Sequence, residues 1–101
     1  MRLENKKAIV TGAGGGIGRA ICVDFVKEGA AVLCLDINEE TVRETVNELT
    51  ELGGKAVAMT ADVAEEASAE AAVKTAVDSF GGLNVLVSNA IADIPYVPLT
   101  E

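Results

Sequence analysis

The fold of this chain is decided near its amino terminus, by the stretch Ala8-Ile9-Val10-Thr11-Gly12-Ala13-Gly14-Gly15-Gly16-Ile17-Gly18. Its apolar start predicts a buried strand, and its glycines predict a tight turn. Apolar residues then recur at helical spacing as far as Phe25, so we expect a helix that ends before Gly29. A helix that begins directly after such a turn offers its first backbone N–H groups, and the positive end of its dipole, to an anion. The stretch therefore predicts a strand, a turn and a helix with room for a phosphate group.

The alternation of strand and helix continues along the rest of the chain. Further apolar runs, typical of strands covered on both faces, occupy residues 31–35, 56–59 and 83–87. Helical periodicity fills the segment from Asn38, a predicted N-cap, to Gly53, and returns over residues 65–80. The connections are short, so the strands should be parallel and their crossovers right-handed. The sequence predicts a single domain of the α/β class.

Composition and charge exclude several classes of protein. A formal net charge of −8, with the basic residues scattered, argues against a nucleic-acid or anionic-membrane partner. We find no run of the roughly 18 to 20 apolar residues that a membrane span needs, and no signal peptide, so a cytoplasmic location is expected. The sequence has no histidine, and Cys22 and Cys34 form no Cys-x-x-Cys pair, which favours two buried free thiols over a metal site.

The spacing of the glycines narrows the class of nucleotide site. Glycines at 12, 16 and 18 give the pattern G-x-x-x-G-x-G, and no frame supplies the three glycines of G-x-G-x-x-G. A P-loop would place Lys and then Ser or Thr after its last glycine, whereas Ile17, Gly18 and Arg19 follow Gly16. The alternative, a tight turn that binds no ligand, stays open at this point.

Asp36 is the second informative residue, because it stands at the end of the second predicted strand. A carboxylate there can accept hydrogen bonds from an adenosine ribose and would repel a 2′-phosphate. Neither Ile37 nor Gly15 offers a cation to that phosphate. This pattern favours NAD over NADP, with a helix-capping or solvent-facing acid as the alternative role.

Taken together, these motifs resemble those of the short-chain dehydrogenases/reductases. The resemblance rests on Thr11-Gly12, Gly16-Ile17-Gly18, Asp36, Asp62-Val63 and Asn89-Ala90, each directly after a predicted strand or at the start of a helix. It covers nearly the whole chain. It implies a three-layer Rossmann-type fold with a mostly parallel sheet, and an oxidoreductase that moves hydride between NAD(H) and an alcohol or carbonyl substrate.

The resemblance also assigns roles to individual residues. It places Gly12, Gly14, Gly15, Gly16, Ile17 and Gly18 around the phosphates of the cofactor. Asp36, with Ile37 beside it, would hold the adenosine ribose, and Asp62 with Val63 would border the adenine. Asn89 and Ala90 would lie beside the remaining ribose. A capping role for Asp62 and a structural tie between strands for Asn89 are the alternatives.

The chain departs from the family in two respects. Ser88-Asn89-Ala90-Ile91 stands where the family usually has Asn-Asn-Ala-Gly, so a side chain at Ile91 could crowd the nicotinamide. Family members are also longer, and place a catalytic Ser and a Tyr-x-x-x-Lys pair beyond the region present here. The only tyrosine is Tyr96, and Thr100 occupies the position of the lysine. We therefore expect the amino-terminal, NAD-binding part of a single Rossmann-fold domain, with no catalytic residue.

Three functional hypotheses follow. The first is the NAD-binding portion of a complete oxidoreductase, which could form homo-oligomers. The second is a short, non-catalytic nucleotide-binding or interaction module, and the third is a Rossmann-like protein that binds S-adenosylmethionine. If the chain ended at Glu101, the edge of the fourth strand would be unpaired, and the isolated product would be marginally stable or prone to aggregate.

Overall fold

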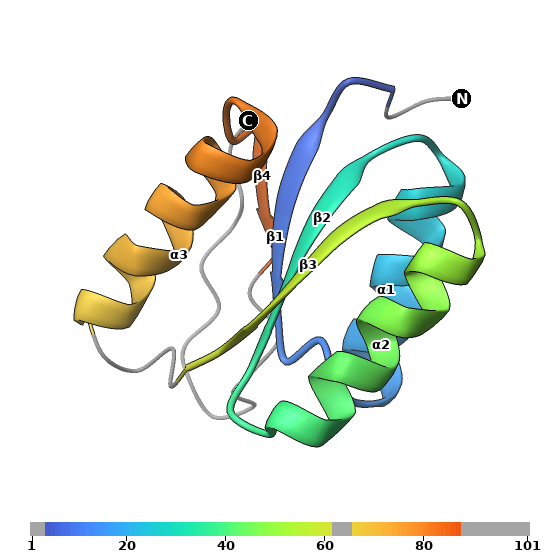
Figure 1. The fold of residues 1–101 in the computed structure, drawn as a ribbon, viewed down its shortest axis with the longest axis horizontal. Coiled ribbons are helices and arrows are strands. Elements are labelled where there is room, and N and C mark those ends of the chain that lie inside the picture. The colour runs from blue at the N-terminus through green and yellow to red at the C-terminus, as the bar shows by residue number, and fades with distance from the viewer. Residues whose placement is uncertain (1–3, 62–65, 88–101) are drawn as a thin grey trace.

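A computed structural model describes residues 4–61 and 66–87, in which strands and helices alternate throughout (Figure 1). The elements, in chain order, are β1 (Lys7–Thr11), α1 (Gly16–Lys27), β2 (Ala31–Asp36), α2 (Glu39–Glu51), β3 (Lys55–Thr60), α3 (Glu66–Phe80) and β4 (Val85–Val87). The predicted α/β order is confirmed. The fourth strand, β4, is shorter than the predicted run of residues 83–87. Just before it, the Asn84 side chain accepts the Lys7 N–H at 2.9 Å.

The strands form one parallel sheet in the order β3-β2-β1-β4. Helices α1 and α2 cover one face and α3 covers the other, which gives the three layers of a Rossmann-type fold (Figure 1). The chain runs outward from β1 to β3 and then returns to place β4 on the opposite side of β1. The direction of winding therefore reverses between β1 and β4, and in such sheets ligands bind beside the carboxyl ends of the strands at the reversal.

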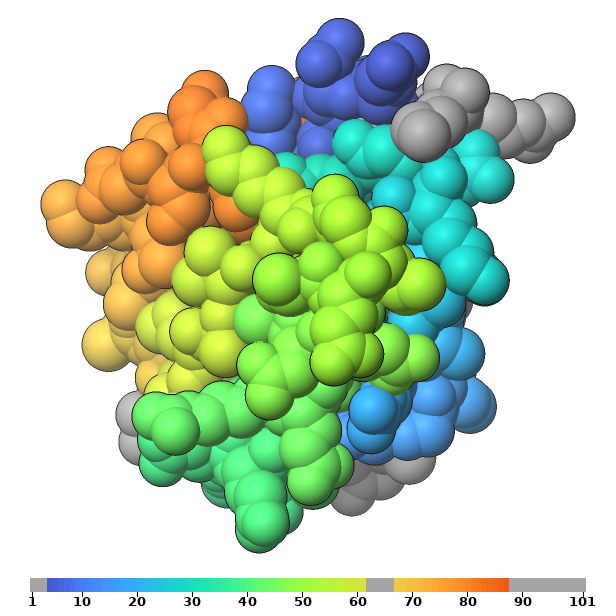
Figure 2. Space-filling model, turned by 45° about the vertical axis from the view of Figure 1, so that its right-hand side comes forward, coloured from blue at the N-terminus to red at the C-terminus, as the bar shows by residue number. Residues whose placement is uncertain are grey.

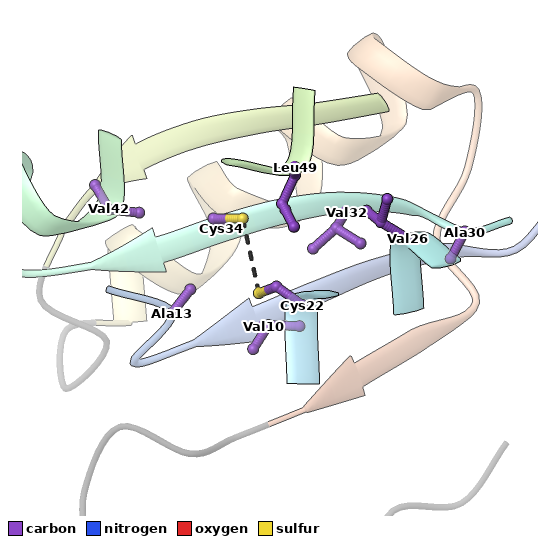
Figure 3. Close-up of a cluster of buried hydrophobic side chains, with 9 residues drawn as sticks. All are labelled: Val10, Ala13, Cys22, Val26, Ala30, Val32, Cys34, Val42 and Leu49. Atoms are coloured by element: carbon purple, nitrogen blue, oxygen red, sulfur yellow. Dashed lines mark hydrogen bonds between the residues drawn. The ribbon is translucent and has the colours of Figure 1, made fainter. Parts of the chain in front are cut away.

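The two central strands are apolar at every interior position because each of their faces meets a helix layer. Alternate residues such as Val32 and Cys34 point towards α1 and α2, whereas Leu33 and Leu35 point towards α3. Figure 3 shows the first of these clusters, which comprises Val10, Ala13, Cys22, Val26, Ala30, Val32, Cys34, Val42 and Leu49. Strand β3 lies at the edge of the sheet with α2 beside it, and α3 and α1 flank the pair (Figure 2).

Each helix of the described ranges is followed within two residues by a glycine in the left-handed region, and the helix end predicted before Gly29 is confirmed. Gly29, Gly53 and Gly81 have φ values of 97°, 84° and 85°. These turns bring the chain back to the sheet without a long loop. None of the three helices in the described ranges is both long and apolar enough to span a bilayer.

Cys22 and Cys34 are free and fully buried, which confirms the expectation from the sequence. Cys22 lies on α1 and Cys34 on β2, and their sulfur atoms are 3.8 Å apart, with the Cys34 thiol donating (Figure 3). No cluster of potential metal ligands occurs within the described part of the chain. Both side chains pack as small apolar groups between α1 and the sheet.

Alkaline pH should destabilise the fold through Cys34. The hydrogen bond to Cys22, burial, and the electrostatic interaction with Cys22, in that order, raise the pKa of Cys34 far above its ordinary value of 9.0. Above pH 9.0 the unfolded chain releases the thiol proton of Cys34, whereas the folded chain retains it. The free energy of unfolding is then unaffected by this group below pH 9.0 and falls as the pH rises above it.

Urea unfolding of the wild type and of Cys34→Ala, at neutral pH and at about pH 10, measures this effect. The alanine variant should lose less stability between the two pH values than the wild type. The same loss in both proteins would contradict the assignment to Cys34.

Candidate functional site

The site begins at the glycine turn, defined here as residues 12–15, which joins the carboxyl end of β1 to α1. Gly12 adopts a φ of 65°, which lets the chain leave the strand sharply. Thr11, the last residue of β1, donates its hydroxyl to the Val87 carbonyl of β4, at 3.3 Å. The turn therefore lies at the point where the winding of the sheet reverses.

The amino terminus of α1 is open, unlike that of α2. Its N-cap, Gly15, is extended and makes no side-chain capping bond, and no acidic residue lies in the first turn. In α2, by contrast, the Asn38 side chain accepts the Thr41 N–H, and Glu39 and Glu40 face the positive end of the helix. The first N–H groups of an α-helix have no partner within the helix, so α1 offers them to an outside acceptor.

The residues of the described ranges leave space next to the first glycines of this helix end. A Cβ atom built on Gly15 or Gly16 meets no atom of residues 4–61 and 66–87 within 4 Å. Both glycines are exposed, and so is Ile17, at 72%. A phosphate group can thus approach the main chain closely, which is the requirement that a site of this kind places on its glycines.

Asp36 lies beside the turn at the end of β2. Its Oδ2 atom accepts the Gly14 N–H at 2.8 Å, and its Oδ1 atom accepts the Asn38 N–H at 3.2 Å. A carboxylate can accept about four hydrogen bonds, so each oxygen has capacity for another donor. The half-buried carboxylate is held in place by the backbone and can still bind a pair of hydroxyl groups.

Gly14 and Gly18 have different positions from the exposed glycines. Both are buried, and the Gly14 N–H is already bonded to Asp36. A Cβ atom on Gly14 would meet Thr41 Oγ1 of α2, and would lie 2.9 Å from Asp36 Oδ2. Gly14 therefore serves close packing between the turn, β2 and α2, whereas Gly15 and Gly16 leave space for a ligand.

Helix α2 contacts the turn through Thr45, which the sequence did not identify as a site residue. The Thr45 hydroxyl donates to the Ala13 carbonyl at 2.8 Å, and Thr45 is completely buried. The sequence does contain an indication of this role, because Thr45 is a polar residue on the apolar face of the helix between Val42 and Leu49. Nearby, Arg19 of α1 is paired with Glu48 of α2 at 2.7 Å.

The remaining predicted positions divide into two groups. Ile37 follows Asp36 and is 70% exposed. Asp62, Val63, Asn89 and Ala90, together with Tyr96, lie outside the described residues. The described part of the site is thus a helix end without a side-chain cap next to a carboxylate, an arrangement suited to a phosphate group and a vicinal diol.

A family model for the short chain dehydrogenases matches residues 6–97. The chain belongs to this family. As a short-chain dehydrogenase it is 40% identical, over 90 residues, to the 7alpha-hydroxysteroid dehydrogenase of Escherichia coli K12, a match that covers 89% of this chain and 35% of the relative. The chain spans only about a third of the length of this curated relative.

Solved structures support the same placement. A hydroxysteroid dehydrogenase from Escherichia coli superposes with a TM-score of 0.86 and 38% identity, covering 93% of this chain and 43% of that protein. A 7 alpha-hydroxysteroid dehydrogenase complexed with NADH and 7-oxo glycochenodeoxycholic acid gives 0.82 and 39%, covering 84% and 33%. The Rossmann-type fold predicted from the sequence is therefore confirmed by structures of the family.

Proposed function

We propose that residues 1–101 are the amino-terminal, NAD-binding part of a short-chain oxidoreductase, and that the catalytic residues lie in a part of the protein outside this sequence. The observation that carries the proposal is the open end of α1 beside the Asp36 carboxylate. The NADH complex of a 39% identical relative supports the choice of ligand. When bound, NAD supplies the hydride chemistry on an alcohol or carbonyl substrate.

Different residues of the described ranges would bind different parts of the cofactor. The first N–H groups of α1, beside Gly15 and Gly16, would receive the pyrophosphate. Asp36 would accept hydrogen bonds from the hydroxyls of the adenosine ribose, because its oxygens are already oriented by Gly14 and Asn38. These groups bind and orient the adenosine half of the cofactor, and the proposal gives them no part in proton transfer.

We further propose a preference for NAD over NADP. The negative charge of Asp36 opposes a 2′-phosphate, and Ile37 places an uncharged side chain next to it. The two arginines on α1 and α2 are already ion-paired, Arg19 with Glu48 and Arg43 with Glu39. A cytoplasmic location is part of the same proposal, since the reducing cytosol suits two free thiols.

Calorimetric titration of the folded chain with NAD, NADP and S-adenosylmethionine tests the proposal. We expect saturable binding of NAD at one site, and dissociation constants at least about tenfold higher for the other two ligands, a difference of 1.4 kcal/mol. Absence of any heat from NAD would contradict the proposal. A preference for S-adenosylmethionine would favour a different class of Rossmann-like protein.

A further inference from the structure

Three consecutive polar groups of the glycine turn are bonded to neighbouring elements. The Ala13 N–H donates to the Leu35 carbonyl of β2 at 3.1 Å, and the Gly14 N–H donates to Asp36 Oδ2 at 2.8 Å. Between them, the Ala13 carbonyl accepts the Thr45 hydroxyl of α2 at 2.8 Å. Two of the partners, Leu35 and Asp36, belong to β2, the strand next to β1. The third partner, Thr45, belongs to α2 and lies 32 residues further along the chain than Ala13.

The hydroxyl of Thr45 stands at a position where an apolar group would be expected. Thr45 is fully buried between Val42 and Leu49, on the face of α2 that packs on the sheet. Burying a hydroxyl without a partner is unfavourable, so its bond to Ala13 explains its presence. The hydroxyl also lies 3.2 Å from the Thr41 carbonyl, but its single proton favours the shorter and better distance of 2.8 Å.

The Ala13 carbonyl is two residues from the helix end that the proposed function assigns to the pyrophosphate. If the Thr45 hydroxyl is removed, the Ala13 carbonyl loses this hydrogen-bond partner in the interior, and we expect the turn to move towards another donor. A movement of Ala13 also moves Gly14 and Gly15, because the three residues are contiguous. The direction of the first N–H groups of α1 would change with it.

We propose that Thr45 is a positioning residue for NAD, which fixes the shape of the glycine turn before the cofactor arrives; this inference rests on the proposed function. The side chain does not touch the open space in front of α1. It acts through Ala13, and its effect on affinity comes from the geometry of the backbone donors. A tenfold change in affinity needs only 1.4 kcal/mol of misalignment, so one buried hydrogen bond is enough.

The test compares Thr45→Val, Thr45→Ala and Thr45→Ser with the matched control Thr75→Val. Thr75 lies on α3 and its hydroxyl donates to the Ala71 carbonyl of the same helix, at 2.8 Å, so the control removes a hydroxyl without touching the turn. The dissociation constant for NAD is measured by calorimetry on folded protein, with folding checked by circular dichroism. Amide chemical shifts of Gly14 and Gly15 are recorded without ligand.

We expect the dissociation constant for NAD to rise roughly three- to tenfold in Thr45→Val and Thr45→Ala, and less than about twofold in Thr45→Ser and Thr75→Val. The two Gly amides should shift in the Val and Ala variants and stay in place in the Ser variant. The alanine variant covers the case in which valine, with a methyl group against the Ala13 carbonyl, prevents folding.

A wild-type affinity in both the Val and Ala variants would overturn the inference while leaving the proposed function intact. Failure of serine to restore the affinity would also overturn it, because serine keeps the hydroxyl and lacks only the methyl group of threonine. A wild-type protein that binds no NAD would instead remove the proposed function, and the role of Thr45 in binding with it.

Discussion

Gly15→Ala is expected to leave the fold unchanged and to weaken NAD binding by about 10- to 100-fold. Gly15 has a φ of −122°, which an alanine adopts freely, and its added Cβ would meet none of the residues that the structure describes within 4 Å. The methyl group would instead occupy the space through which the pyrophosphate reaches the N–H groups of α1. Calorimetry with NAD measures the affinity, and urea unfolding measures the stability.

Gly82→Ala is the matched control for this prediction. Gly82 lies between α3 and β4, away from the glycine turn, and its Cβ would also enter open space. It should bind NAD as the wild type does, within about twofold. An unchanged affinity in Gly15→Ala would show that the pyrophosphate does not approach the helix end at this residue, and would contradict the proposed geometry.

Gly14→Ala should give the opposite result. Here the Cβ atom meets Thr41 Oγ1 and Asp36 Oδ2, so the protein itself must deform. Overpacking of this kind costs about 1–3 kcal/mol of the free energy of unfolding. Substitution of Gly15 is therefore expected to lower the affinity for NAD, whereas substitution of Gly14 is expected to lower the stability of the fold.

The sequence predicted the elements of this fold well because its signals are local. The apolar runs of β1 and β2, the Asn38 cap and the terminal glycines are each read within a few residues. The contacts that shape the site are not local. Asp36 reaches Gly14 across 22 residues and Thr45 reaches Ala13 across 32 residues, so no pattern within a single element reveals them.

The glycines illustrate the same limit. From the sequence, Gly14, Gly15 and Gly16 form one run with one role around the phosphates. In the structure, Gly14 packs beneath α2 whereas Gly15 and Gly16 face open space. The difference depends on where Thr41 lies, which follows from the packing of α2 on the sheet and not from the residues of the run itself.

Asp36→Asn should weaken NAD binding by more than about tenfold and also lower the stability of the protein. The Gly14 and Asn38 N–H groups meet different oxygens of the carboxylate. An asparagine in the same position replaces one of these oxygens with an NH₂ group, so one of the two N–H groups would face a donor. Hydrogen bonds to charged groups contribute about 1.5–3 kcal/mol, and we expect a loss of this order in urea unfolding.

Asp24→Asn is the matched control, because it removes the same charge from an exposed position on α1. Its affinity for NAD should stay within about twofold of the wild-type value. An Asp36→Asn protein that binds NAD as tightly as Asp24→Asn would contradict the assignment of the ribose to this carboxylate.

Titration of each variant with both NAD and NADP separates the two roles of Asp36. The two cofactors share the pyrophosphate, so a displaced glycine turn weakens both by the same factor. The contact with the ribose distinguishes them, because a neutral side chain at position 36 loses an acceptor for NAD and no longer repels the 2′-phosphate of NADP. The dissociation constant for NADP divided by that for NAD therefore reports the ribose contact alone. This ratio should fall in Asp36→Asn but not in Thr45→Val. If the ratio stayed constant while both affinities fell, Asp36 would act only as an anchor for Gly14.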